Sequence, residues 1–291
     1  CLVNAATFPT TFGECNLEIF KEEINEIPEL VDIIKYETKR LTNQLGPIDK
    51  HPFSIYIINN KNEFIEKAGT IPEWGIAVAK MNPDRIIMQS TGLANISYKR
   101  MKKILIHELN HIYMFRLPNY QTIPSWFKEG MAMTYANEFT IFYKLEISRA
   151  ILDNEIIPLN NLNYISNFKK DKVRLAYAES AAGIDLIKKY YGTNALTNIM
   201  SFLHYGNNFD KALKNITGED LLIFQDKFEK FLNDNYNWIF LIQVYKYIYV
   251  ILPLILILGF IFKRYRNKKI LKLWNLEEEL EDIKWKNNLH N

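Results

Sequence analysis

Cysteine and histidine are scarce in this chain, whose 291 residues include two cysteines and five histidines. Neither Cys1 nor Cys15 has a neighbour that indicates catalysis or metal binding. Net charge is also small, at +3, and the whole excess lies beyond residue 262, where eight Lys and Arg stand against five Asp and Glu. The balanced remainder excludes a basic nucleic-acid-binding surface. Internal repeats and low-complexity segments are absent from the sequence.

Two of the five histidines stand four residues apart in the segment His107-Glu108-Leu109-Asn110-His111. Residues with this spacing lie on one face of a helix, so both imidazoles can bind one ion. Glu108 then lies beside the metal, where its carboxylate can accept a proton from water. The motif therefore predicts a metal site that carries its own general base.

Glu129 is the expected third ligand. Pro124 and Ser125 are typical of the start of a helix, and Glu129 would lie about one turn into it. Two imidazoles and a carboxylate leave a fourth tetrahedral position for water, as in catalytic zinc sites. Zinc suits this mixed set of nitrogen and oxygen ligands and lowers the pKa of its water to about 7.

These motifs resemble those of the gluzincin metallopeptidases, and in particular of the peptidase MA-like domains. The shared residues stand in two segments, His107-Glu-Leu-Asn-His111 and Pro124-x-Trp126-x-x-Glu129-Gly130-x-Ala132. The resemblance implies zinc ligation by His107, His111 and Glu129. It also implies that Glu108 is the general base.

The same resemblance implies a catalytic role for Tyr177, which opens Tyr177-Ala-Glu-Ser-Ala-Ala-Gly183. In the related aminopeptidase N group, a tyrosine that opens a similar helix donates to the oxyanion of the tetrahedral intermediate. Ser180 stands where that group has a glycine. Those enzymes also hold the substrate's amino end with a glutamate on an upstream strand, and the segment from Trp74 to Lys80 lacks it. Aminopeptidase specificity therefore does not transfer.

Each of these residues also has a structural explanation. The two histidines could be core residues that are hydrogen-bonded to the backbone. Glu129 could be a solvated helix charge, and Tyr177 could be a buried tyrosine whose hydroxyl is satisfied. Trp126 is expected to serve packing.

The periodicity predicts an α+β fold, with a gluzincin-like domain at residues 17–235 after an N-terminal segment at 1–16. A helix is expected over residues 17–45. The sequence then predicts a small sheet, an active-site helix and a helical C-terminal part. The expected strands and active-site helix are 53–58, 75–79, 85–89 and 97–115. One strand beside the metal should bind peptide by edge addition, although the sequence does not say which one.

A transmembrane helix is predicted at residues 238–262, where the run from Tyr247 to Phe262 has no charge. A helix of this length spans about 37 Å, enough for a tilted crossing of a hydrocarbon core about 30 Å thick. The basic cluster from Lys263 to Lys269 then predicts a cytoplasmic tail at 263–291 and an extracytoplasmic catalytic domain. A buried core helix is the alternative.

The chain begins with Cys1 rather than Met, and three interpretations stay open. A mature bacterial lipoprotein begins with a lipidated cysteine. A disulfide between Cys1 and Cys15 would fit an oxidising compartment. A coincidental boundary is the third.

These features together predict a membrane-anchored, extracytoplasmic zinc metallopeptidase that cuts peptide or protein substrates internally. The alternative is a catalytically inactive surface protein of the same fold, which would act as a binding or scaffold module. A zinc hydrolase with a non-peptide substrate stays open as well. The intact Glu108 favours catalysis, because a structural metal site needs no general base.

Overall fold

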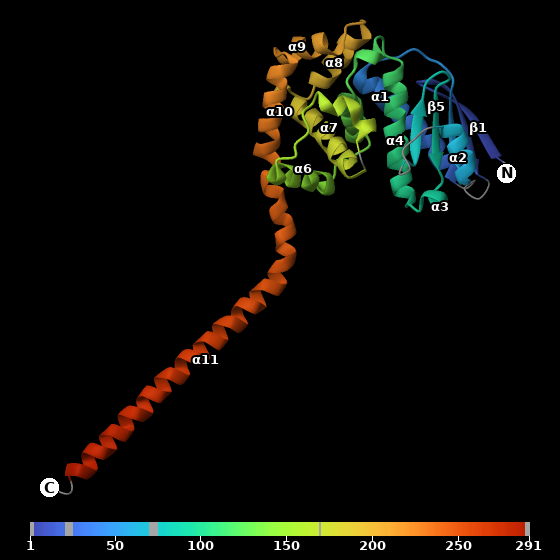
Figure 1. Cartoon of the computed structure of the whole chain (residues 1–291). Helices are drawn as coiled ribbons and strands as arrows, with labels where there is room; N and C mark the ends of the chain where they lie inside the picture. Colours follow the sequence, from blue (N-terminus) through green and yellow to red (C-terminus); the bar gives the residue numbers. More distant parts are fainter. Residues whose placement is uncertain (1–2, 21–25, 70–74, 169, 289–291) are drawn as a thin grey trace. The chain divides into compact units, whose positions relative to one another are not determined.

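The computed structural model describes residues 3–20, 26–69, 75–168 and 170–288. The chain divides into two compact units, Cys1–Trp238 and Ile239–Asn291. The first unit contains one sheet and a group of helices, and the second consists mostly of one long helix (Figure 1).

The sheet has five strands among the described residues, in the order β1-β2-β3-β5-β4. Strands β2, β3 and β5 run parallel, while β1 and β4 are the antiparallel strands at its two edges. The strands are β1 (Val3–Thr10), β2 (Gly13–Phe20), β3 (Phe53–Ile58), β4 (Ala77–Lys80) and β5 (Arg85–Gln89).

The α-helices of the first unit lie between and after the strands in the sequence. They are α1 (Ile27–Leu45), α2 (Lys61–Ala68), α3 (Thr91–Ala94), α4 (Tyr98–Phe115), α5 (Ser125–Tyr135), α6 (Ile141–Asp153), α7 (Lys170–Tyr191), α8 (Ala195–His204), α9 (Phe209–Thr217) and α10 (Leu221–Tyr236). Short 3-10 turns stand at η2 (Tyr120–Thr122), η3 (Asn161–Asn167) and η4 (Asn237–Phe240), and α11 (Leu241–Asn288) follows.

Alternating apolar side chains give the sheet two buried faces. Ile55 of β3 lies in register with Ile86 of β5, and both are fully buried on one face. On the other face Ile58 and Ile87 pack against Phe64 of α2. Because strand side chains alternate between faces, one β3–β5 pair can anchor helices on both sides. Figure 1 shows α4 and α2 on opposite sides of β5.

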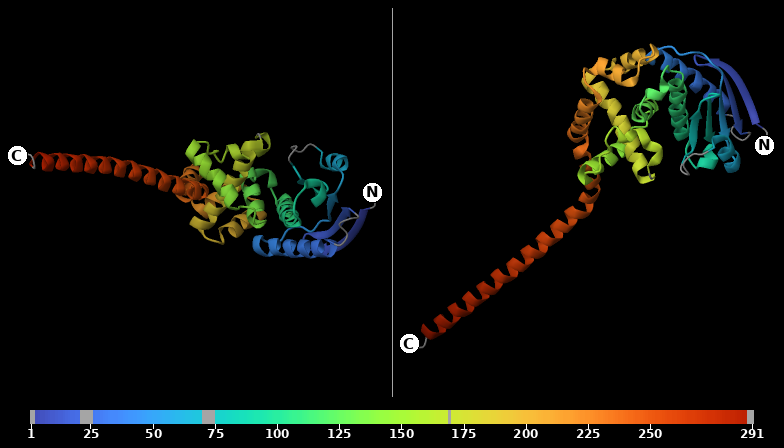
Figure 2. Two further views of the ribbon diagram at one scale, coloured as in Figure 1. Left: turned by 90° about the horizontal axis from the view of Figure 1, so that it is seen from below. Right: turned by 45° about the horizontal axis from the view of Figure 1, so that its top comes forward.

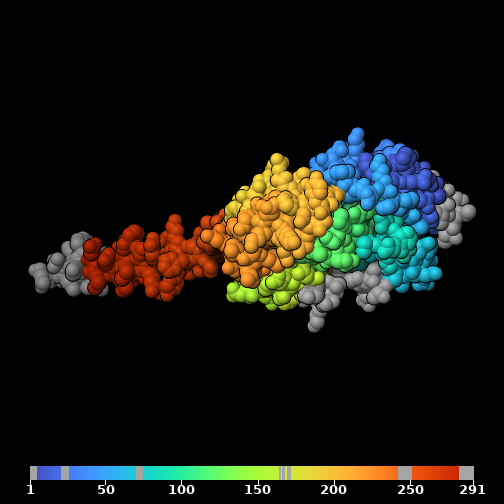
Figure 3. Space-filling view, turned by 90° about the horizontal axis from the view of Figure 1, so that it is seen from above, coloured from blue at the N-terminus to red at the C-terminus, as the bar shows by residue number. Residues whose placement is uncertain are grey.

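Helix α4 is the element that the sheet and the helical part share. It begins where the Ser97 side chain accepts a hydrogen bond from the Arg100 N–H, at 3.3 Å. It packs against β4 and β5 on one side and against α5 on the other. Helices α5 to α10 gather on the side of α4 away from the sheet (Figure 2). In Figure 3 green atoms lie between the blue and cyan region and the orange helices.

Helices α5 and α7 approach each other closely because two glycines face the neighbouring helix. A Cβ added at Gly130 of α5 would lie 2.3 Å from the carbonyl oxygen of Ser180 on α7. A Cβ at Gly183 of α7 would lie 3.0 Å from the ring of Trp126 on α5. Trp126 is 1% exposed, as expected for a packing residue. These contacts set the spacing between the helices that carry Glu129 and Tyr177.

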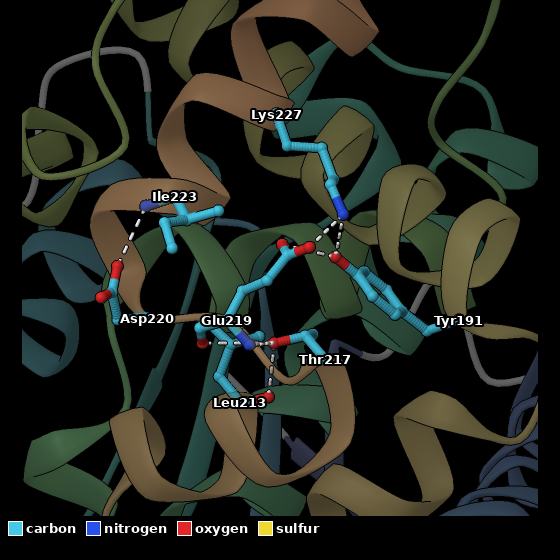
Figure 4. A network of polar contacts seen from close by, with 7 residues as sticks. All are labelled: Tyr191, Leu213, Thr217, Glu219, Asp220, Ile223 and Lys227. Carbon is cyan, nitrogen blue, oxygen red and sulfur yellow. Dashed lines mark hydrogen bonds and ion pairs between the residues drawn. The ribbon is translucent and has the colours of Figure 1, made fainter.

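A polar network joins the end of α7 to the turn between α9 and α10 (Figure 4). The Tyr191 hydroxyl donates to Glu219 Oε2 at 2.7 Å, and Lys227 Nζ donates to both residues. Thr217 Oγ1 accepts the Glu219 backbone N–H at 3.1 Å. The Lys227–Glu219 pair is partly exposed to solvent. This network positions the helix ends but is too exposed to contribute much stability.

The helix expected over residues 17–45 begins only at Ile27, because the residues up to Phe20 form strand β2. Cys15, Leu17 and Ile19 alternate with polar residues and are fully buried, which is the pattern of a strand. The hairpin of β1 and β2 was not predicted from the sequence. Cys15 is a free, buried thiol, and burial raises its pKa to about 12.

The prediction of a transmembrane helix at residues 238–262 is wrong. Among the helices whose side chains are described, none is long and apolar enough to cross a membrane.

Lipidation of Cys1 and an extracytoplasmic location stay predictions. Cys1 lies outside the described residues.

We expect the substitution Gly130→Ala to lower the free energy of unfolding by about 1–3 kcal/mol, because the new Cβ would press on the α7 backbone. Urea denaturation followed by circular dichroism measures this change. Gly92→Ala is the matched control, since its Cβ would lie 3.6 Å from Asn59 Oδ1, an ordinary contact. Equal stability of the two variants would contradict the close-packing argument.

Candidate active site

The structure brings together the three side chains predicted to bind metal. His107 Nε2 lies 3.3 Å from Glu129 Oε2, and His111 Nε2 lies 3.5 Å from the same oxygen. One ligand atom from each residue lies within 4.8 Å of the others. The two histidines come from successive turns of α4, and the carboxylate comes from α5. This group could hold a metal ion.

The chemistry of these atoms fits a bound cation. Glu129 Oε2 is buried and has no hydrogen-bond partner of good geometry among the described residues, although both imidazole nitrogens face it. A buried charged oxygen is costly unless a cation or donors satisfy it. Two nitrogens and one carboxylate oxygen are a zinc ligand set with an open fourth position.

Electrostatics also favour the charged form of Glu129. Burial alone would raise its pKa, but the interactions with His111 and His107 outweigh burial and lower the pKa below its ordinary value. The carboxylate is therefore ionised and available as a ligand over the neutral pH range.

Glu138 contacts the nitrogen of His107 that does not face Glu129. Its Oε2 lies 2.9 Å from His107 Nδ1. Burial acts to raise the pKa of Glu138, yet His107, Arg100 and Lys103 outweigh it and lower the pKa. A carboxylate on Nδ1 fixes the imidazole tautomer and directs Nε2 toward the metal position.

Sequence reasoning missed Glu138 because it belongs to no spaced motif. It follows Asn137, which takes a left-handed conformation with φ of 51° at the end of α5. The Glu138 N–H then donates to the Met133 carbonyl at 2.9 Å, which folds the chain back toward α4. An asparagine after an apolar helix was a signal for this turn, but nothing in the sequence connected the turn to His107.

Glu108 stands beside this group, where the sequence placed it. It is 8% exposed and lines the same cleft as His107. Burial raises the pKa of its carboxyl group above the usual range, and the neighbouring His111 and His107 oppose this only in part. A raised carboxyl pKa suits a group that must accept and release a proton near neutral pH.

Tyr177 of α7 also reaches the group. Its ring centroid lies 6.4 Å from that of His107 in an edge-to-face arrangement. The negative charge of Glu129, followed by burial, raises its pKa well above the ordinary value, so the hydroxyl stays protonated and can donate. Ser180, at the position of the family's glycine, bonds to the Ala176 carbonyl at 2.7 Å within the same helix.

A cleft of about 700 Å³ opens over His107, Glu108 and Tyr177. Its other walls come from the start of α4, from α6 and from the segment that leads into β4. Ile76 and Ala77 line it from that segment. Since β4 is an edge strand of the sheet that the described residues form, the cleft lies beside a strand edge.

The family model of the Peptidase MA superfamily matches residues 35–234. This chain belongs to that superfamily. Membership supports a zinc metallopeptidase, which agrees with the ligand set formed by His107, His111 and Glu129. The sequence matches none of the curated proteins.

Solved structures of low sequence identity are similar to the chain. One is an M1 zinc metallopeptidase from Deinococcus radiodurans, with 11% identity and a TM-score of 0.46, covering 79% of this chain and 52% of that one. Another is a mutant M1 zinc metallopeptidase from the same organism bound to a Tyr-Ser-Ala substrate, with 11% identity and a TM-score of 0.45. That match covers 79% of this chain and 51% of the other. The chain thus spans about half the length of these relatives.

We expect Glu138→Gln to weaken zinc binding about 10–100-fold, because the neutral amide holds the His107 ring less firmly. Glu129→Ala should weaken binding further by removing a ligand. Competition with a chromophoric chelator measures both affinities. Glu66→Gln, at an exposed position of α2, is the matched control. Wild-type affinity in the Glu138 variant would show that this carboxylate does not support the site.

Proposed function

We propose that this protein is a zinc-dependent metallopeptidase that hydrolyses peptide bonds within a chain. The observation that carries the proposal is the meeting of His107, His111 and Glu129 at one point, with Glu108 beside them in an open cleft. A structural metal site would be closed by a fourth protein ligand and would need no adjacent base.

The bound zinc would polarise the scissile carbonyl and lower the pKa of the attacking water. Glu108 accepts the proton of that water as it attacks the carbonyl carbon. The same carboxyl group then donates the proton to the leaving amine, so the base is restored at the end of the cycle. The buried position of Glu108 favours this exchange, because burial raises the pKa of its carboxyl group.

Tyr177 donates its hydroxyl hydrogen to the oxyanion of the tetrahedral intermediate. The position of its ring near His107 and its high pKa both support this role. A donor of this kind acts mainly in the transition state, where negative charge develops on the oxygen.

We propose that β4 is the strand that binds substrate by edge addition. Its inner edge pairs with β5, and its outer edge has no partner strand among the described ones. An extended peptide on this edge would run past Glu108, since Ile76 and Ala77 line the same cleft as that carboxylate. Residues 75–80 offer no carboxylate for a free amino end, which supports internal cleavage.

We expect Glu108→Gln to retain zinc while hydrolysis falls by about 10²–10⁴-fold, because the amide cannot accept the proton. Digestion of a proteome-derived peptide library, read by mass spectrometry, measures cleavage, and elemental analysis measures zinc. Undiminished cleavage by this variant would exclude Glu108 as the base. If zinc-loaded wild type cleaves no peptide of the library, the inactive binding module becomes the better interpretation.

We expect Tyr177→Phe to lower kcat about a hundredfold while KM stays nearly constant, since the hydroxyl contributes only in the transition state. Steady-state kinetics on a peptide found in the library digestion measures both constants. Tyr190→Phe, on the exposed side of the same helix, is the control. A rise in KM with an unchanged kcat would instead make Tyr177 a ground-state binding residue.

A further inference from the structure

Two carboxylates and two guanidinium groups line the cleft. Among the described lining residues, Glu108 belongs to the proposed chemistry and Glu138 is held by His107. The remaining charged side chains are two arginines, Arg100 of α4 and Arg174 of α7. Ile104 and Val173 lie beside them in the cleft, so the two guanidinium groups adjoin apolar walls. A positive charge next to an apolar wall binds anions more strongly than one in open water.

Helical geometry places both arginines at a defined distance from the reacting groups. Arg100 precedes His107 by two turns on the same face of α4, or about 10 Å along the helix axis. Arg174 precedes Tyr177 by about one turn on α7. Since an extended peptide rises about 3.3 Å per residue, a group held by Arg100 would lie roughly three residues from the bond that is cut.

The carboxylates near these arginines leave them incompletely paired. Arg100 Nη1 lies 3.7 Å from Glu138 Oε1, beyond hydrogen-bond distance, and 45% of the Arg100 side chain is exposed. Glu146 Oε1 lies 2.8 Å from Arg174 Nη2 and 3.5 Å from Arg149 Nη1, so one carboxylate faces two guanidinium groups. The Arg174 side chain is 62% exposed.

We propose that Arg100 and Arg174 are specificity-determining residues that bind a carboxylate of the substrate within about three residues of the cleaved bond. The inference rests on the proposed peptidase function and adds a substrate class, peptides that carry a carboxylate near the cleaved bond. The carboxylate comes from an Asp or Glu side chain or from a C-terminus. Tyr143 of α6 lines the same cleft and offers a neutral hydroxyl donor to that group. Arginine suits this role because its planar guanidinium donates two parallel hydrogen bonds to a carboxylate.

Binding tests the inference without requiring turnover. The probes are three ten-residue peptides, labelled with fluorescein at the amino end and identical apart from the tested groups. One carries two Glu and a C-terminal amide, the second carries Gln in place of Glu, and the third is the Gln peptide with a free carboxylate. Fluorescence anisotropy on the full-length, zinc-loaded Glu108→Gln protein measures each Kd at low ionic strength.

The Glu peptide or the free-carboxylate peptide should bind at least tenfold more tightly than the neutral peptide, and which of them does so identifies the source of the carboxylate. Arg100→Gln and Arg174→Gln should each reduce this preference about threefold or more, and the double variant should abolish it. Binding of the neutral peptide should stay unchanged, which shows that the variants are folded. Salt should weaken the preference in the protein that retains both arginines.

Arg149→Gln is the matched control, because Arg149 shares Glu146 with Arg174 but does not line the cleft. Equal affinity for all three peptides, or an equal loss in the Arg149 variant, would overturn the inference. Cleavage by wild type without charge preference would overturn it while leaving the peptidase proposal intact. Carboxylate-selective binding without any cleavage by wild type would do the reverse.

Discussion

The meeting of two imidazole nitrogens and one buried carboxylate oxygen is the constraint on which the rest of this structure depends. The two nitrogens lie 3.3 and 3.5 Å from the oxygen, and this oxygen has no hydrogen-bond partner of good geometry in the described part of the chain. Such an arrangement is costly unless a cation occupies the space between the ligands. The close α5–α7 contact at Gly130 and the carboxylate of Glu138 hold the three side chains against that cost.

Helix α4 lies between the sheet and the other helices, so a single face of this helix can carry several functional residues. In the proposed mechanism its His107 and His111 supply ligands and Glu108 supplies the base, and Arg100 lies two turns away along the same cleft. The sheet contributes an edge strand beside this helix, and α7 contributes Tyr177. In the proposed arrangement the substrate backbone, the reacting carbonyl and the substrate side chains meet separate elements. Changes at Arg100 and Arg174 would then alter specificity without moving the residues proposed to bind zinc.

The sequence pattern predicted an element correctly where the residues of that element alone showed its periodicity. Strands β3 and β5 and helix α4 follow from their own periodicity, and the His-Glu-x-x-His spacing follows from the helical turn. The hairpin of β1 and β2 was harder, because the short alternation at Cys15, Leu17 and Ile19 stands close to the helical spacing of α1. For the apolar run in α11 the sequence predicted too much. Its composition alone favoured a membrane span, which the described helix does not support.

The sequence by itself determined the family and the candidate residues for metal ligation and for the general base. These depend on residue identity and spacing within single helices or between neighbouring ones, which the 3.6-residue turn converts directly into geometry. Only the tertiary structure decided that Glu138 contacts His107, that β4 is the edge beside the cleft, and that Arg100 and Arg174 line the same cleft. Each of these relations joins segments that belong to different elements, and no helix or strand period determines how far apart they lie in the sequence. Their meeting depends on how the sheet and helices pack, and packing is a property of the whole core.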